Sequence, residues 1–211
     1  MADLVRGLTA QQLETPVPGC PGWTVHGVVS HLAGVATDAV NGRLQGIPTP
    51  EQTAAQVEAR ATTPTPVVLR EWERTGSQLE MLLTKSEGRL VAPVVDVAVH
   101  EQDIRGAVDQ PGNREGPLID LVVERTVARF LNKVESAGLA PVVVVDPAGQ
   151  VIAGQEGSPV ELRLSRFELF RMLYGRRSRA QIERRFVGAD DPGAYVPILA
   201  VFGPAEADII E

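Results

Sequence analysis

The sequence predicts an α+β protein, with a four-helix bundle in its N-terminal part and a small α+β domain in its C-terminal part. Up to residue 136, apolar residues recur at the three- and four-residue spacing of helices, in segments joined by short to moderate loops. After that residue, short apolar or alternating runs are separated by turn residues, which is typical of strands. We therefore expect two domains, at residues 1–136 and 137–211.

The helical part is predicted from apolar periodicity together with start and stop signals. Thr24 is a good N-cap residue after a loop rich in proline and glycine, and Thr49 with Gln52 forms a capping box. Pro93 and Pro117 suit the first turn of a helix, where no backbone N–H is needed. Helices are expected at residues 3–13, 24–44, 50–60, 65–83, 93–108 and 117–135.

The C-terminal part combines strand and helix signals. Residues 141–154, PVVVVDPAGQVIAG, predict two strands joined by an Asp-Pro-Ala-Gly turn, and residues 160–164 predict a third strand. Ser165 with Glu168, and Ser178 with Gln181, form further capping boxes and therefore predict two short helices.

Composition limits the classes of partner and the compartment. The net charge of −7 and the pI near 5.1 argue against nucleic acid or an anionic membrane surface as the main partner. One cysteine cannot form an internal disulfide, which favours a reducing compartment. No apolar run approaches the ~20 residues that span a bilayer, and the amphipathic, acid-containing N-terminus is not typical of a signal peptide. We expect a cytoplasmic protein that acts on small molecules, and its oligomeric state stays open.

The helix at residues 93–108 carries polar residues where a core-facing stripe belongs. Asp96, His100 and Asp103 fall on one side, between apolar residues. Burying a carboxylate and an imidazole without partners costs several kcal/mol, and a divalent metal would compensate that cost. Asp96 and His100 are four residues apart, so both can reach one ion. The alternative is an internal Asp–His pair without metal.

A third ligand is available on the second predicted helix. His31 borders the apolar face of that helix, and three protein ligands with one water would form an open, catalytic type of site. The alternative is a half-buried histidine satisfied by a carbonyl group. Asp103 could orient an imidazole ligand from behind, or it could be a surface acid that pairs with an arginine.

Two other features could contribute to chemistry. Cys20 has no activating neighbour in the sequence, and a lone loop cysteine is usually inert. Arginines are concentrated between residues 171 and 185; most would form a solvated face, although one or two could clamp a carboxylate. Arg176 is our candidate for binding an anionic group of the cofactor or substrate. The sequence contains no Walker loop, dinucleotide fingerprint, nucleophile elbow or Cys-x-x-Cys motif.

Three segments resemble the mycothiol-dependent maleylpyruvate isomerase family, within the DinB/YfiT-like metalloproteins. Residues 19–35, GCPGWTVHGVVSHLAGV, resemble its W-T-V…H-L helix, and residues 96–112, DVAVHEQDIRGAVDQPG, resemble its E-x-x-x-H-x-x-D helix. Residues 169–178, LFRMLYGRRS, resemble the Gly-Arg helix end of its C-terminal domain. The resemblance implies a DinB-like bundle with a divalent metal, usually zinc, held by His31, Asp96 and His100.

The resemblance also implies an activity. Members use mycothiol, a small bacterial thiol, bound at the metal as thiolate, to isomerise maleylpyruvate or to transfer the thiol. The sequence departs from the family in having Asp96 where glutamate is usual, so the helix must lie closer to the metal or hold it less tightly. We therefore expect a metal-dependent transferase or isomerase for a small electrophile. The alternative is a catalytically silent bundle that serves as a ligand-binding or regulatory module.

Overall fold

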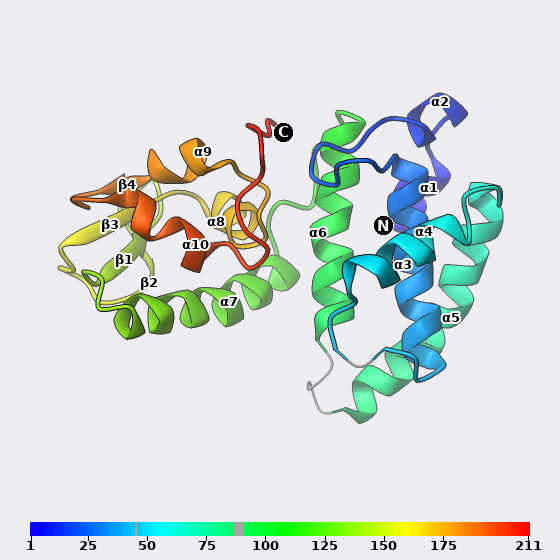
Figure 1. Cartoon of the computed structure of the whole chain (residues 1–211), viewed down its shortest axis with the longest axis horizontal. Coiled ribbons are helices and arrows are strands. Elements are labelled where there is room, and N and C mark those ends of the chain that lie inside the picture. The colour runs from blue at the N-terminus through cyan, green and yellow to red at the C-terminus, as the bar shows by residue number, and fades with distance from the viewer. Residues whose placement is uncertain (45, 87–90) are drawn as a thin grey trace. The chain divides into compact units, whose positions relative to one another are not determined.

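The computed structural model describes residues 1–44, 46–86 and 91–211 (Figure 1). The chain divides into two compact units, Met1–Pro111 with Glu211, and Gly112–Ile210. In the described residues the first unit contains only helices, whereas the second combines helices with a four-stranded sheet. This arrangement confirms the predicted α+β class with a helical N-terminal part.

The first unit is built around helix α3 (Val25–Val40), which packs against α4, α5 and α6. The Thr24 side chain accepts a hydrogen bond from the Gly27 backbone N–H at 3.3 Å, and this N-cap fixes where α3 begins. The other helices of the unit are α1 (Ala2–Arg6), α2 (Ala10–Leu13), α4 (Pro50–Glu58), α5 (Thr65–Lys85) and α6 (Ala92–Ala107). No helix in the described ranges has the length and apolarity needed to cross a lipid bilayer.

Two helix boundaries differ from the sequence prediction. The helix expected at residues 3–13 is two short helices, because Thr9 and Gln12 form a capping box that starts α2 anew. Helix α3 ends at Val40 rather than near residue 44. There the Asn41 side chain donates to the Thr37 carbonyl at 2.8 Å, and Gly42 adopts a positive φ of 67°, which a continuing helix does not allow.

The second unit contains a sheet with strand order β2-β1-β3-β4. Strand β1 pairs antiparallel with β2 and parallel with β3, and β3 pairs antiparallel with β4. The first three strands confirm the sequence prediction, whereas the two-residue β4 was missed because it carries too short a pattern. The elements are α7 (Pro117–Ser136), β1 (Val142–Val145), β2 (Val151–Ala153), β3 (Val160–Arg163), α8 (Arg166–Leu173), α9 (Arg179–Glu183), β4 (Phe186–Val187), the 3-10 helix η1 (Pro192–Ala194) and α10 (Val196–Leu199).

Helix α7 lies in the second unit, although the sequence prediction placed it in the bundle and put the domain boundary at residue 136. The units instead divide between Pro111 and Gly112. Helix α7 packs against α8, α10 and β2, and it buries Val123, Val127 and Phe130. Its amphipathic pattern is the same for either neighbour, so periodicity could not say which unit it joins.

Candidate metal centre

His31 lies at the most buried part of α3. Every residue from Gly27 to Ala36 is buried, because α3 is covered by other helices of its unit. The His31 side chain is only 5% exposed. Its Nδ1 atom lies 3.0 Å from Oε1 of Gln56 on α4. The outer nitrogen is therefore satisfied by a carbonyl oxygen, as in the alternative considered from the sequence, although this carbonyl belongs to a side-chain amide and the imidazole is buried rather than half-buried.

Helix α6 brings Asp96 and His100 to the same place. Asp96 Oδ2 lies 3.2 Å from His31 Nε2, and Asp96 Oδ1 lies 3.4 Å from His100 Nε2. The two imidazole rings meet edge to face, with their centroids 5.2 Å apart. The structure therefore brings together all three residues predicted as metal ligands, and Asp96 contacts both imidazoles despite being shorter than glutamate.

The donor set fits a divalent metal. The potential ligand atoms of His31, Asp96 and His100 all lie within 4.8 Å of one another. A zinc ion with bonds of about 2.0–2.1 Å to nitrogen and oxygen places neighbouring tetrahedral ligands roughly 3.3 Å apart. The two nitrogen–oxygen separations of 3.2 and 3.4 Å match that spacing. Two imidazoles and one carboxylate are also a usual set for catalytic zinc.

The hydrogen bonds of the outer nitrogens also favour a cation. Nδ1 of His31 faces an amide oxygen, and Nδ1 of His100 faces Asp103 Oδ2 at 2.9 Å. Both partners accept hydrogen bonds, so each Nδ1 carries a proton and the neutral ring presents an Nε2 lone pair. Two such lone pairs would then face the Asp96 carboxylate. Three hydrogen-bond acceptors that face one another repel, so the arrangement is favourable only with protons or a metal ion between them.

The contacts between Asp96 and His100 shift the pKa values of both side chains. Burial raises the pKa of Asp96, but the charge of His100 and hydrogen bonds from both histidines outweigh burial and hold this pKa far below its ordinary value. Burial lowers the pKa of His100, but the Asp96 charge and the hydrogen bond to Asp103 raise it well above its ordinary value. Without a metal, these contacts favour the protonated form of His100 beside the carboxylates of Asp96 and Asp103.

Asp103 and Cys20 both contact the Nδ1 side of the His100 imidazole. The Asp103 carboxylate accepts from His100 Nδ1, and the Cys20 thiol donates to the same Oδ2 atom at 3.4 Å. Cys20 Sγ also lies 3.6 Å from His100 Nδ1. The Asp103 carboxylate thus holds the orientation of the His100 imidazole, and it does not form the surface pair with an arginine that was the alternative. Cys20, Asp103 and His100 also form a second buried group with potential ligand atoms close together.

Trp23 lies beside both imidazoles. Its ring centroid is 5.1 Å from that of His31 and 6.4 Å from that of His100. Aromatic rings at these distances pack against one another, and the face of an indole favours a nearby positive charge. Helical periodicity along the sequence carries no signal for a contact between Trp23 and α6.

Arg176, the candidate anion-binding residue, lies in the second unit. It is buried, and its guanidinium donates to the Tyr174 carbonyl at 2.7 Å. A pocket of about 210 Å³ in this unit is lined by other arginines of the predicted cluster, with Glu168, Met172 and Gln181. The arginines that line it are Arg177, Arg184 and Arg185. Arg177 is paired with the Glu168 carboxylate through two hydrogen bonds of 2.9 and 2.6 Å.

Comparison with known proteins matches the N-terminal part of the chain to a family. Residues 1–87 match the family model described as the mycothiol maleylpyruvate isomerase N-terminal domain, which is 87 of the 211 residues. The match includes His31 on α3 and ends before α6. A search of curated proteins and a search of solved structures found no match. Residues 1–87 are thus similar to the mycothiol maleylpyruvate isomerase N-terminal domain.

Proposed function

We propose that this protein is a metal-dependent enzyme in which His31, Asp96 and His100 hold a divalent metal, with zinc as the best fit to the donor set. It would use mycothiol to act on a small electrophilic substrate, as a thiol transferase or a maleylpyruvate isomerase-like isomerase. One observation carries the proposal: three acceptor atoms from two helices converge, and hydrogen bonds fix both outer histidine nitrogens. The family of residues 1–87 supports mycothiol as the thiol.

Each side chain of the centre has a distinct part in this function. When bound, the metal lowers the pKa of a coordinated thiol, which makes the thiolate available near neutral pH. Three protein ligands leave one position of a tetrahedral site for a small molecule. Trp23 would shield the imidazoles beside which it packs. Arg176 is not part of this centre, because it lies in the second unit, and it stays only the sequence-based candidate for an anionic group. A reducing, cytoplasmic compartment is part of the proposal, because a free thiol is needed.

Metal analysis tests the ligand set. We expect the purified protein, or the protein titrated with zinc, to bind one equivalent, and His31→Ala or His100→Ala to lose it. His26→Ala is the matched control: this third histidine also lies on α3, but its nitrogens contact Thr65 and the Arg60 carbonyl instead. A wild-type protein that cannot take up zinc would favour the alternative of a silent ligand-binding or regulatory module.

An assay of thiol transfer tests catalysis. Mycothiol is supplied with a panel of small electrophiles, including carboxylate-bearing alkenes with a cis double bond, and loss of thiol or isomerisation is followed. We expect turnover by the zinc-loaded protein and none above background by His31→Ala. Equal rates for the two proteins across the whole panel would contradict an enzymatic role.

A further inference from the structure

Gln56 is an unusual residue for its helix. Helix α4 is short and mostly exposed, and Gln56 is its one buried residue. A buried amide is costly unless its donor and acceptor are both paired. Here both are paired, since Gln56 Oε1 meets His31 Nδ1 at 3.0 Å and Gln56 Nε2 donates to Asp38 Oδ2 at 2.8 Å. The side chain therefore connects a predicted metal ligand to a carboxylate on the same helix α3.

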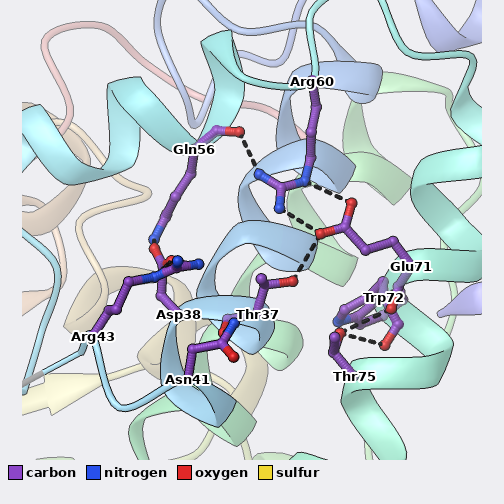
Figure 2. A network of polar contacts seen from close by, with 9 residues as sticks. All are labelled: Thr37, Asp38, Asn41, Arg43, Gln56, Arg60, Glu71, Trp72 and Thr75. Atoms are coloured by element: carbon purple, nitrogen blue, oxygen red, sulfur yellow. Dashed lines mark hydrogen bonds and ion pairs between the residues drawn. The ribbon is translucent and has the colours of Figure 1, made fainter.

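Asp38 decides which way the amide faces. A carboxylate only accepts hydrogen bonds, so the NH₂ group of Gln56 must point to it and the amide oxygen must point to His31. Arg43 holds Asp38 in turn, because its Nε and a terminal nitrogen lie 3.0 and 2.9 Å from the other oxygen, Oδ1 (Figure 2). With the oxygen of Gln56 facing it, His31 Nδ1 carries the proton and Nε2 is left to face Asp96.

A second set of contacts holds the end of α4 in place. Arg60 donates to the Gln56 backbone carbonyl at 2.9 Å and also to the Glu71 carboxylate on α5 (Figure 2). Thr37 of α3 donates to the same carboxylate at 2.8 Å. These contacts tie α3, α4 and α5 together around Gln56, so its amide is held from the backbone side as well.

Gly34 makes room for this side chain. A Cβ atom at position 34 would lie 2.5 Å from both Cβ and Cγ of Gln56, closer than side chains approach. Glycine inside a helix costs roughly 0.5–1 kcal/mol relative to alanine. At this position the cost is offset by a close approach of Gln56, which a side chain at residue 34 would prevent.

We propose that Gln56 is a positioning residue for the metal centre, because it fixes the ring orientation and the Nδ1-protonated form of His31. Asp38 holds the Gln56 amide, and the absence of a side chain at Gly34 leaves space for it. The inference rests on the proposed function, because it assigns a task to Gln56 within that site. Hydrogen bonds behind a metal-ligating histidine typically change metal affinity 10–100-fold when removed. Gln56→Leu keeps the approximate size of the side chain and removes both hydrogen bonds.

Zinc competition measurements on the full chain test the role. We expect Gln56→Leu to weaken zinc binding about 10–100-fold, and Gln11→Leu, an exposed glutamine on α2, to leave it unchanged. Gln56→Glu places a second carboxylate against Asp38 and should also weaken binding. Asp38→Asn added to Gln56→Glu restores one donor and one acceptor and should recover affinity to within a few-fold of wild type. An unchanged affinity in Gln56→Leu, or no recovery in the double variant, would overturn the proposal.

A readout without metal separates this inference from the proposed function. Nitrogen-15 NMR of the histidine side chains in the metal-free protein should show a proton on Nδ1 of His31, protected by its hydrogen bond, and loss of that protection in Gln56→Leu. If wild type takes up no zinc, the metal proposal fails, while this measurement still decides the role of Gln56. A wild-type His31 whose Nδ1 carries no proton overturns it.

Discussion

At the scale of single residues, the centre depends on what lies behind each imidazole. His31 and His100 both turn Nε2 toward Asp96, and each Nδ1 is held by a side chain that accepts its proton. Asp103 is almost fully buried and receives hydrogen bonds from both His100 and Cys20. A buried carboxylate with these contacts both fixes the ring and raises the basicity of the opposite nitrogen.

Replacing the Asp103 carboxylate tests that support. In Asp103→Asn an amide can meet His100 with its NH₂ group, which repels the Nδ1 proton, and the negative charge is lost. We expect zinc affinity, measured by competition with a chelator, to fall about 10–100-fold. Asp109→Asn is the control, because this exposed residue follows α6 with a positive φ of 53°, which asparagine adopts readily. Equal affinities in the two variants would remove Asp103 from the centre.

At the scale of elements, the centre forms because α3, α4 and α6 approach one another closely. The approach of α4 depends on Gly34, since a Cβ atom there would overlap Gln56. Another helical glycine, Gly76 in the middle of α5, has open space around it, because a Cβ atom at that residue would meet no atom within 4 Å. Packing therefore gives no reason for glycine at residue 76. We expect substitution by alanine to have opposite effects on stability at residues 34 and 76.

Replacing Gly34 and Gly76 by alanine, one at a time, distinguishes the effect of packing on stability from the effect of helix propensity. Gly34→Ala overpacks the α3–α4 contact and should lower the free energy of unfolding by about 1–3 kcal/mol, with weaker zinc binding. Gly76→Ala should raise it by about 0.5–1 kcal/mol, because alanine restricts the unfolded chain without a clash. Urea unfolding followed by tryptophan fluorescence measures both changes. A neutral Gly34→Ala with wild-type zinc affinity would show that α4 need not lie so close.

In the second unit, the ion pair between Glu168 of α8 and Arg177 links stability to pH. Burial raises the pKa of Glu168, but hydrogen bonds and charge from Arg177 outweigh burial and hold this pKa below its ordinary value. A carboxyl group with a depressed folded-state pKa stabilises the fold above its unfolded pKa. That stabilisation is lost as the pH falls through the folded pKa.

Glu168→Gln should therefore destabilise the second unit at neutral pH, by about 1–3 kcal/mol, because Arg177 stays buried without its charged partner. The difference from wild type should shrink as the pH falls below about 4.5, the ordinary value for glutamate. Urea unfolding at pH 7 and in acid, followed by near-ultraviolet circular dichroism of tyrosine, measures it. Glu183→Gln removes an exposed pair with Arg179 and should cost about 0–1 kcal/mol. A difference for Glu168→Gln that stays constant with pH would contradict the assignment.

At the scale of the whole molecule, the aromatic residues distinguish the two units. Both tryptophans, Trp23 and Trp72, lie in the first unit with the proposed metal centre, and both tyrosines, Tyr174 and Tyr195, lie in the second. Tryptophan fluorescence therefore reports unfolding of the unit that would bind metal. A metal that binds only the folded state stabilises it by mass action, about 2.7 kcal/mol at a hundredfold excess over Kd.

Zinc at that excess should raise the free energy of unfolding, measured by tryptophan fluorescence, by about 2.7 kcal/mol, and it should raise the unfolding midpoint accordingly. His100→Ala should remove the increase, because it deletes one of the three proposed ligands, and His26→Ala should retain it. Thermal or urea unfolding with and without zinc, read at the tryptophan emission band, gives the comparison. An increase of the same size in His100→Ala would place the zinc elsewhere in the protein.

The sequence alone determined local features of this protein: the acid–histidine spacing on α6, the capping boxes of α4 and α9, the first three strands and the candidate His31. These follow from spacing along one segment, where helical or strand geometry decides which side chains share a face. Only the tertiary structure decided that α7 joins the second unit, that Gln56 holds His31, and that Cys20 and Trp23 lie beside His100. Those contacts join segments far apart in the sequence, and they are set by which faces are buried together rather than by any local pattern.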